Sequence, residues 1–387
     1  MKIKPKDRLA TVLDDRQRLP EVLRPLHRLL TGVAEPGANP KRSTPLRMFA
    51  KDLGWLGGST LAAGGGAMLA SAGPMGALFG VPIAAIGVLV AIGRNRRLVV
   101  SHVHEASHGV VADFYRARGL SEHQARRIAE GILDLGSSIT MTLNGQDYRS
   151  THMLHHEFEH LGTLSDPDGT TLKEWHIWPD ETRDVRATIL RTALNPLWHL
   201  RFLWDRILSN VARGKAYRRI LGAAAMALAI GSAFVLPLPI WLAAVFLPFG
   251  PGYQIASLAQ LTTIHPYGYS EGAKTIDDYA ERTWDRIPYT PMPEKGAGVA
   301  AWLGWSWSMF GHSVARMTVL DDTMVPHGYH HVAWPIERPF DDWWNTAQYW
   351  ADAYVAGALP EGAEDRIVWG LTEAWDRQQA HFERMRG

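Results

Sequence analysis

Two long stretches of the chain are mostly apolar and carry no charged residue. The first runs from 53 to 93 and is interrupted at Gly73-Pro74, and the second runs from 220 to 264 and is interrupted at Pro237 and Pro239. A helix rises 1.5 Å per residue, so about 20 residues cross the ~30 Å apolar core of a bilayer. We therefore predict two transmembrane helical hairpins, each of which enters the membrane and returns to the side it came from.

The stretches outside the hairpins are polar. Basic residues follow the first hairpin (Arg94, Arg96) and precede the second (Arg213, Lys215), which favours a cytoplasmic location for these flanks. We expect an all-α integral membrane fold in which the two hairpins carry a cytoplasmic helical domain. The predicted segments are a cytoplasmic amphipathic lead-in (1–52), hairpin 1 (53–93), a cytoplasmic segment (94–219), hairpin 2 (220–264) and a final cytoplasmic segment (265–387) that ends on a helix at about 363–386.

Local patterns refine this scheme. Ser121 and Gln124 form a capping-box pattern that predicts a helix start. Glycines are frequent in the first half of hairpin 1, which suits close helix packing in lipid. A buried hairpin of a soluble protein is the alternative interpretation. The Trp-rich tract 302–307 is typical of a membrane interface, or it could line a substrate channel.

Composition excludes several classes of function. Lys plus Arg number 40 against 39 for Asp plus Glu, so the chain lacks the basic excess that a nucleic-acid-binding protein uses to neutralise phosphates. It contains no cysteine, which excludes disulfides, thiolate zinc sites, cysteine-ligated iron–sulfur clusters and a cysteine nucleophile. Any metal must therefore be held by His, Asp or Glu.

Histidine is abundant, with 17 residues, and eight of them form three clusters. The clusters read HEASH, HMLHH and HGYHH, and their histidines are His104 and His108; His152, His155 and His156; and His327, His330 and His331. Residues at i, i+3 and i+4 share one face of a helix, and an adjacent pair is splayed by about 100°, so that such a pair could serve two metals. We interpret the isolated histidines as ordinary surface or core residues: His27, His123, His176, His199 and His381.

The predicted topology brings the clusters together. The first two clusters follow hairpin 1 and the third follows hairpin 2, so an even number of crossings separates them and all lie on one side of the membrane. Imidazole is a good ligand for iron, zinc or copper. Eight ligands are too many for one ion, which indicates two metals.

The three clusters, in this order and with a two-span hairpin before the first and another between the second and third, resemble the histidine boxes of the membrane fatty acid desaturase and hydroxylase superfamily. The resemblance covers about 53–339. Asp166-Pro167-Asp168 is similar to a motif that often follows the second box, and His265 is placed like an additional ligand after the fourth span. The resemblance implies nine ligands for two iron ions: His104, His108, His152, His155, His156, His265, His327, His330 and His331. His102, His160 and His312 are near-site candidates.

The resemblance also implies the reaction. A di-iron centre would use O₂ as co-substrate to desaturate or hydroxylate an unactivated C–H bond of a lipid or lipid-like substrate, such as an acyl chain, an isoprenoid or another biosynthetic intermediate. Electrons would come from an external donor, a ferredoxin or a similar carrier. Carboxylates that could orient the ligands are Glu105, Glu157, Asp166, Asp168 and Asp322. The expected location is a bacterial cytoplasmic membrane, with the metal site on the cytoplasmic face.

Two other interpretations remain open. HEASH also matches the HExxH pattern of zinc peptidases, in which His104 and His108 would bind zinc and Glu105 would act as general base. The zinc peptidase interpretation leaves both HxxHH clusters unexplained. A non-catalytic metal transporter or sensor would require polar residues inside its spans, and the predicted spans carry no charge. Metal analysis distinguishes a zinc peptidase, with one zinc per chain, from a di-iron oxidase, with two irons per chain.

Overall fold

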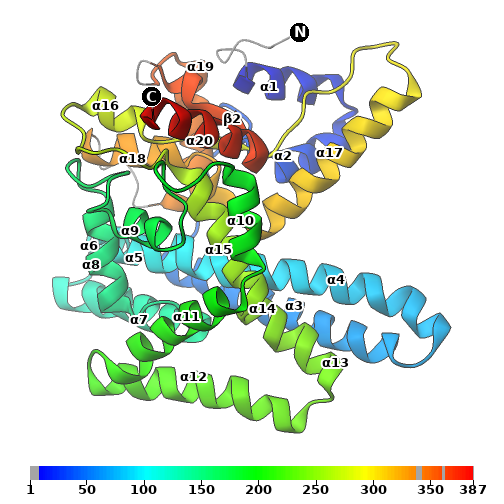
Figure 1. Cartoon of the computed structure of the whole chain (residues 1–387), viewed down its shortest axis with the longest axis vertical. Helices are drawn as coiled ribbons and strands as arrows, with labels where there is room; N and C mark the ends of the chain where they lie inside the picture. The colour runs from blue at the N-terminus through cyan, green and yellow to red at the C-terminus, as the bar shows by residue number, and fades with distance from the viewer. Residues whose placement is uncertain (1–7, 337–341, 360–361, 387) are drawn as a thin grey trace. The chain divides into compact units, whose positions relative to one another are not determined.

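The computed structural model, drawn in Figure 1, describes residues 8–336, 342–359 and 362–386. The chain is mostly helical (73%), as the hydropathy pattern predicts. Two short strands in the described residues, β1 (Asp285–Ile287) and β2 (Ile367–Trp369), pair in parallel. The fold therefore depends on helix packing, and the strand pair is a short local pairing of two segments.

The chain forms two compact units. Unit 1 consists of Met1–Arg42, His155–Ile189 and Ala259–Gly387, and unit 2 consists of Ser43–Leu154 and Leu190–Leu258. The chain passes from one unit to the other inside three helices, α8 (Gly145–His155), α10 (Val185–Ala193) and α15 (Pro251–Ile264). The first of these passages divides the second histidine cluster between His152 and His155.

Unit 2 contains the apolar helices and the first histidine cluster. Its other elements are α3 (Pro45–Ala70), α4 (Pro74–Arg97), η3 (Leu98–Val103), α5 (His104–Ser107), α6 (Val110–Arg116), α7 (Glu122–Thr140), α11 (Pro196–Ile207), η4 (Leu208–Ala212), α12 (Ala216–Val235), α13 (Leu238–Trp241), η5 (Leu242–Phe246) and α14 (Leu247–Phe249). The helices break at both predicted interruptions, after Ala70 and after Val235. The capping box at the start of α7 forms as predicted, with Ser121 and Gln124 bonded reciprocally.

Glycines let α3 and α4 approach each other closely. A Cβ atom on Gly66 would lie 2.4 Å from the backbone nitrogen of Ala84, and one on Gly80 would lie 2.3 Å from that of Ala70. Because glycine has no Cβ, the two backbones pack without an intervening side chain. The glycine content of 53–93 thus has a direct structural cause.

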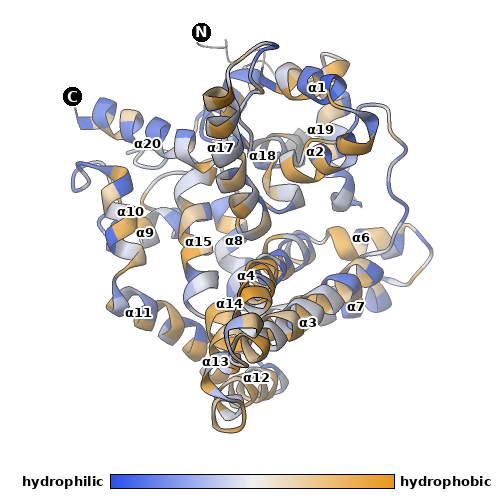
Figure 2. Cartoon of the chain, turned by 90° about the vertical axis from the view of Figure 1, so that its right-hand side faces the viewer, coloured by the Kyte–Doolittle hydropathy of each residue, from blue (hydrophilic) through white to orange (hydrophobic). Residues whose placement is uncertain are grey.

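Among the residues that the structure describes, three helical stretches are long and apolar enough to cross a membrane: Pro74–Ser107, Ala216–Val235 and Leu238–Ile264. Figure 2 shows apolar residues along α4, α12 and α13. Many of their large side chains are exposed, such as Phe79 (57%), Leu228 (75%) and Phe234 (87%). Exposed apolar surface on this scale is characteristic of protein that contacts lipid or another protein.

Unit 1 contains His155 and His156 of the second histidine cluster and all of the third. Its elements besides those that cross between units are α1 (Arg8–Arg18), η2 (Glu21–Leu23), α2 (Arg24–Thr31), α9 (Pro167–Glu174), α16 (Ile276–Glu281), α17 (Val299–Thr318), η6 (Asp322–Met324), α18 (His327–Ile336), η7 (Trp343–Asn345), α19 (Thr346–Val355), η8 (Ala363–Arg366) and α20 (Gly370–Arg386). The final helix begins at Gly370 instead of near 363, because a 3₁₀ turn and strand β2 occupy the preceding residues. A bidentate ion pair between Arg8 and Glu373 (Nη2–Oε1 2.7 Å) ties α1 to α20.

Candidate metal centre

Four histidines of unit 1 form a buried cluster. His155 ends α8, His265 directly follows α15, and His327 and His331 lie one turn apart on α18. Each offers a ring nitrogen, and these nitrogens all lie within 4.8 Å of one another. The Nε2 atoms of His155 and His265 are 3.1 Å apart, as are those of His327 and His331. All four side chains are buried, His265 and His331 completely.

The opposite ring nitrogens are held by the protein. His265 Nδ1 donates to the carbonyl oxygen of Arg282 at 2.8 Å, and His155 Nδ1 donates to both carboxylate oxygens of Asp166 at 3.0 Å. Neither acceptor can donate, so Nδ1 of each ring carries a proton and Nε2 is the atom left for a metal. Such contacts to the far nitrogen are the usual means by which proteins orient metal-binding imidazoles.

Tyr279 orients a third ring. Its hydroxyl donates to the backbone oxygen of His156 at 3.0 Å and lies 2.9 Å from Nδ1 of His331. Because its one proton is used on the carbonyl, the hydroxyl oxygen accepts from His331 Nδ1. His331 therefore also directs an Nε2 lone pair into the cluster.

Local sequence fixes the position of Asp166. It is fully buried and is the N-cap of α9, where Pro167 takes the first helical position. Its carboxylate accepts the backbone N–H of Asp168 at 2.9 Å and that of Gly162 at 3.0 Å. Two backbone donors thus hold the carboxylate in place for His155.

Burial controls the charge of the cluster. It lowers the pKa of His265 and His331 well below the ordinary value, and the neighbouring histidines lower both further. Burial acts in the same direction on His155, but the carboxylates of Asp166 and Asp168 outweigh it and raise its pKa to about 9. At pH 7 and without metal, His265 and His331 are therefore neutral and His155 is protonated.

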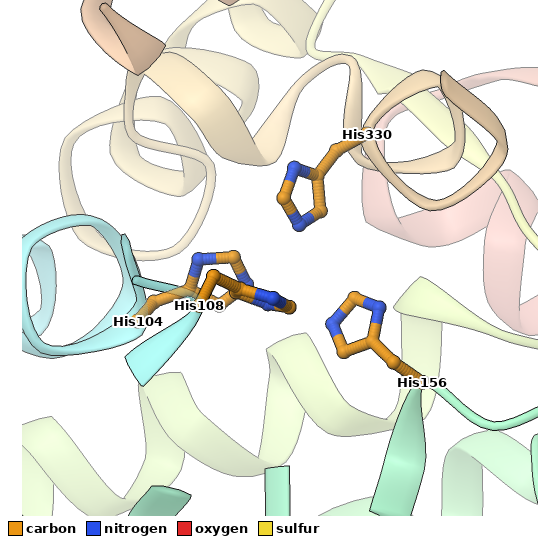
Figure 3. A group of neighbouring side chains, drawn as sticks. All are labelled: His104, His108, His156 and His330. Carbon is orange, nitrogen blue, oxygen red and sulfur yellow. The ribbon is translucent and has the colours of Figure 1, made fainter. Parts of the chain in front are cut away.

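Two more histidines of unit 1 lie beside the cluster. His156 stacks on His331, with ring centroids 4.1 Å apart and planes inclined by 11°. The rings of His156 and His330 are 5.5 Å apart and nearly perpendicular, and Figure 3 shows both side chains. Unit 1 therefore gathers six of the nine predicted ligands.

Unit 2 gathers the other three predicted ligands. The ring centroids of His104, His108 and His152 are 4.4 to 4.9 Å apart, and the Nε2 atoms of His108 and His152 are separated by 2.9 Å. Figure 3 includes His104 and His108, which come from α5 and the residue that follows it. Glu105 is buried, and its Oε1 lies 3.0 Å from Nδ1 of His104.

A buried charged network supports this end of unit 2. Asp52 of α3 binds Nε of Arg97 at 2.8 Å and Nε2 of His102 at 2.8 Å. The π-helical segment η3 carries His102 and leads directly into α5. Single π turns inside helices are frequent at functional sites. His102, a near-site candidate, is thus bonded to Asp52 two residues before His104.

The remaining predicted residues have other surroundings. Asp168 lies at the edge of the cluster, with Oδ2 3.7 Å from His155 Nδ1. Glu157 is exposed, and its carboxylate lies 3.3 Å from Nε2 of His160. His312 lies 3.0 Å from the hydroxyl of Thr290. The side chain of Asp322 falls outside the described part of the chain.

Sequence reasoning missed Tyr279 and the carbonyl of Arg282. No motif marks either residue, and a residue of any type could supply a backbone carbonyl at that position. The isolated histidines behave as interpreted in two buried cases, where His27 packs against Tyr289 and His381 packs against Tyr269.

The donor set suits a divalent transition metal. Four imidazole nitrogens can bind iron, zinc or copper once His155 gives up its second proton, and the buried surroundings keep bulk water from the ligands. Comparison with protein-family models, curated proteins and solved structures gives no match for this chain.

Proposed function

We propose that the chain is a membrane di-iron oxidoreductase that uses O₂ to desaturate or hydroxylate an unactivated C–H bond of a lipid or lipid-like substrate. The observation that carries this proposal is the buried four-histidine cluster of unit 1, three of whose rings are held through Nδ1. Bound iron would supply the reaction with O₂ and the removal of hydrogen. An external ferredoxin-like carrier would provide the two electrons that the overall reaction consumes.

The two ions would use different ligands. His155, His265, His327 and His331 would hold the first. The resemblance to the histidine boxes implies that the second would take the remaining histidines: His104, His108, His152, His156 and His330. The chain's own groups would hold these rings in place, with Asp166, Tyr279 and the Arg282 carbonyl acting on the first set and Glu105 acting on His104.

The membrane arrangement belongs to the same proposal. The three long apolar stretches would cross the bilayer, and α3, packed closely on α4, would complete the first hairpin. Basic residues near the ends of these stretches support a cytoplasmic location for the histidines. The lipid environment would give an apolar substrate direct access to the protein.

A zinc peptidase is less well supported. Its general base must be free to activate water at the metal. Glu105 is 3% exposed, and its carboxylate is bonded to the Nδ1 atom of the adjacent His104. That contact suits a carboxylate that orients a ligand.

Metal analysis tests the proposal. The detergent-extracted chain, reconstituted with Fe(II) under reducing and anaerobic conditions, should hold close to two irons, and the reduced centre should be reoxidised by O₂. His331→Ala and His156→Ala should abolish this reaction while membrane insertion persists. His381→Ala, a buried histidine outside the clusters, is the matched control and should react normally. Binding of a single ion per chain after reconstitution would refute the di-iron proposal.

A further inference from the structure

Helix α17 exposes an unusually apolar face. Val299, Leu303, Trp307 and Phe310 are 76%, 66%, 76% and 61% exposed. At 100° per residue these four positions fall within an arc of about 80° on one side of the helix. The sequence carries no charged residue from 296 to 315, so the face is uncharged along its whole length.

The opposite side of α17 is polar and faces its own unit. Trp305 Nε1 donates to the backbone oxygen of Thr290 at 2.9 Å, and the hydroxyl of Ser308 bonds that of Thr290 at 2.5 Å. Near the end of the helix, Arg316 Nε donates to the backbone oxygen of Leu29 at 3.1 Å. The helix therefore has its polar side inward and its apolar side outward.

This polarity is the reverse of that of a helix at a water surface. A surface helix in water buries its apolar stripe in the core and exposes its polar side. Helices that contact lipid expose the apolar side. Tryptophan is also enriched where a bilayer meets water, because its ring is apolar and its N–H is polar. The surroundings that suit the exposed face of α17 are therefore lipid.

The neighbouring helix α2 has the same character. Arg316 joins it to α17, and Leu26 and Leu29 are 50% and 64% exposed. Arg24 and Arg28 lie one turn apart on α2, and Arg28 is exposed. Basic residues beside an apolar face complement the anionic headgroups of a membrane. This charge favours a lipid surface over a second copy of the chain as the occupant.

We infer that the outer face of α17, with the adjoining side of α2, is embedded in the interfacial layer of a bilayer without crossing it. Polar contacts with the body of unit 1 hold α17 at both Trp305 and Arg316, so the helix stays on one side. The inference rests on the chain being held in a membrane, as proposed above, and does not depend on the metal chemistry. It adds a contact with lipid that lies outside the three candidate spans.

Site-directed spin labelling tests this inference on the full chain, which has no cysteine of its own. Single cysteines replace Leu303, Trp307, Leu228 and Arg126, and the labelled protein is placed in nanodiscs containing anionic lipid. Leu228→Cys reports a candidate span, and Arg126→Cys reports a water-exposed charged position whose native side chain is 70% exposed. Each label is measured for collision with O₂, which concentrates in lipid, and with a water-soluble nickel chelate.

The expected ratio of O₂ to nickel accessibility at Leu303→Cys and Trp307→Cys is close to that at Leu228→Cys and well above that at Arg126→Cys. A ratio like that of Arg126→Cys would show a water-exposed face and overturn the inference. Low accessibility to both reagents would show a face covered by protein and would also overturn it. If Leu228→Cys itself proved water-accessible, the proposed membrane arrangement would fail as well, so the two failures are distinguishable.

Discussion

Replacing Asp166 with asparagine tests how the cluster of unit 1 holds its ligands. The fully buried carboxylate receives three donors: Nδ1–H of His155 and the backbone N–H groups of Gly162 and Asp168. Asparagine has the same shape but one acceptor oxygen fewer, and its NH₂ group must face one of these donors. The backbone groups cannot turn away, so His155 is the partner that loses its bond. Its ring is then free to move, or to shift its proton to Nε2, the atom intended for the metal.

The size of the effect follows from the role of such contacts. Loss of a group that orients a metal ligand typically weakens metal binding by about 10- to 100-fold. A tenfold change corresponds to about 1.4 kcal/mol, so the expected loss is about 1.4 to 2.7 kcal/mol. Only the ion held by His155 should be affected. One of two metal equivalents should therefore weaken and the other should keep its affinity.

Chelator competition measures this loss. The chain is loaded with Co(II), whose visible absorption reports ligation, and is titrated with a chelator of known affinity. Asp180→Asn makes the same chemical change at an exposed carboxylate bonded to Lys173 and should behave as the unmodified protein. Circular dichroism and elution from a sizing column establish that Asp166→Asn is folded. Affinity within twofold of the unmodified chain at both sites, in a folded variant, would refute the orienting role of Asp166.

Three further predictions concern separate features. Tyr279→Phe leaves Nδ1–H of His331 without its acceptor, so we expect this variant to be less stable by about 1 to 3 kcal/mol in denaturant titrations and to bind metal more weakly. Unchanged stability would contradict the assigned hydrogen bond. Because the pKa of His155 is raised to about 9, binding of the ion that His155 holds should displace its proton, so the affinity for that ion should rise with pH from 7 to 9 and level off above 9. Calorimetry across several buffers at pH 7 should show about one proton released when this ion binds, and a flat pH profile would contradict this charge state. Gly66→Ala should destabilise the chain by about 1 to 3 kcal/mol through the contact between α3 and α4, whereas Gly65→Ala, where a Cβ meets nothing within 4 Å, should not, as thermal unfolding in detergent would show.

The sequence predicted the parts of the site that depend on local spacing. Histidines at i, i+3 and i+4 share a helix face wherever the helix packs, so His327 and His331 could be paired from the sequence alone. Asp166 could be proposed because it lies only 11 positions from His155. The mainly helical fold and the positions of the helix breaks followed from hydropathy and proline in the same way.

Contacts between distant segments could not be predicted in this way. Tyr279 reaches His331 across 52 positions, and the Arg282 carbonyl reaches His265 across 17. Such pairs depend on how helices pack, which no local pattern specifies. A histidine at the end of an apolar stretch has no distinguishing spacing of its own. Only the resemblance to a family therefore suggested His265. The reversed polarity of α17 could not be predicted from the sequence either, since the sequence shows which residues share a face but not which way that face points.

The π-helical segment η3 has a consequence for how this protein tolerates insertions and deletions. A π turn contains one residue more than the α-helical turn it replaces. Deleting one residue between Leu98 and Val103 would therefore return the segment to regular α-helix and leave the residues beyond it close to their present orientation relative to α4. Deleting one residue from α4 itself would instead turn His104 and His108 by about 100°, away from the face on which they meet His152. A systematic deletion scan should therefore find this six-residue segment more tolerant of a single loss than the last turn of α4.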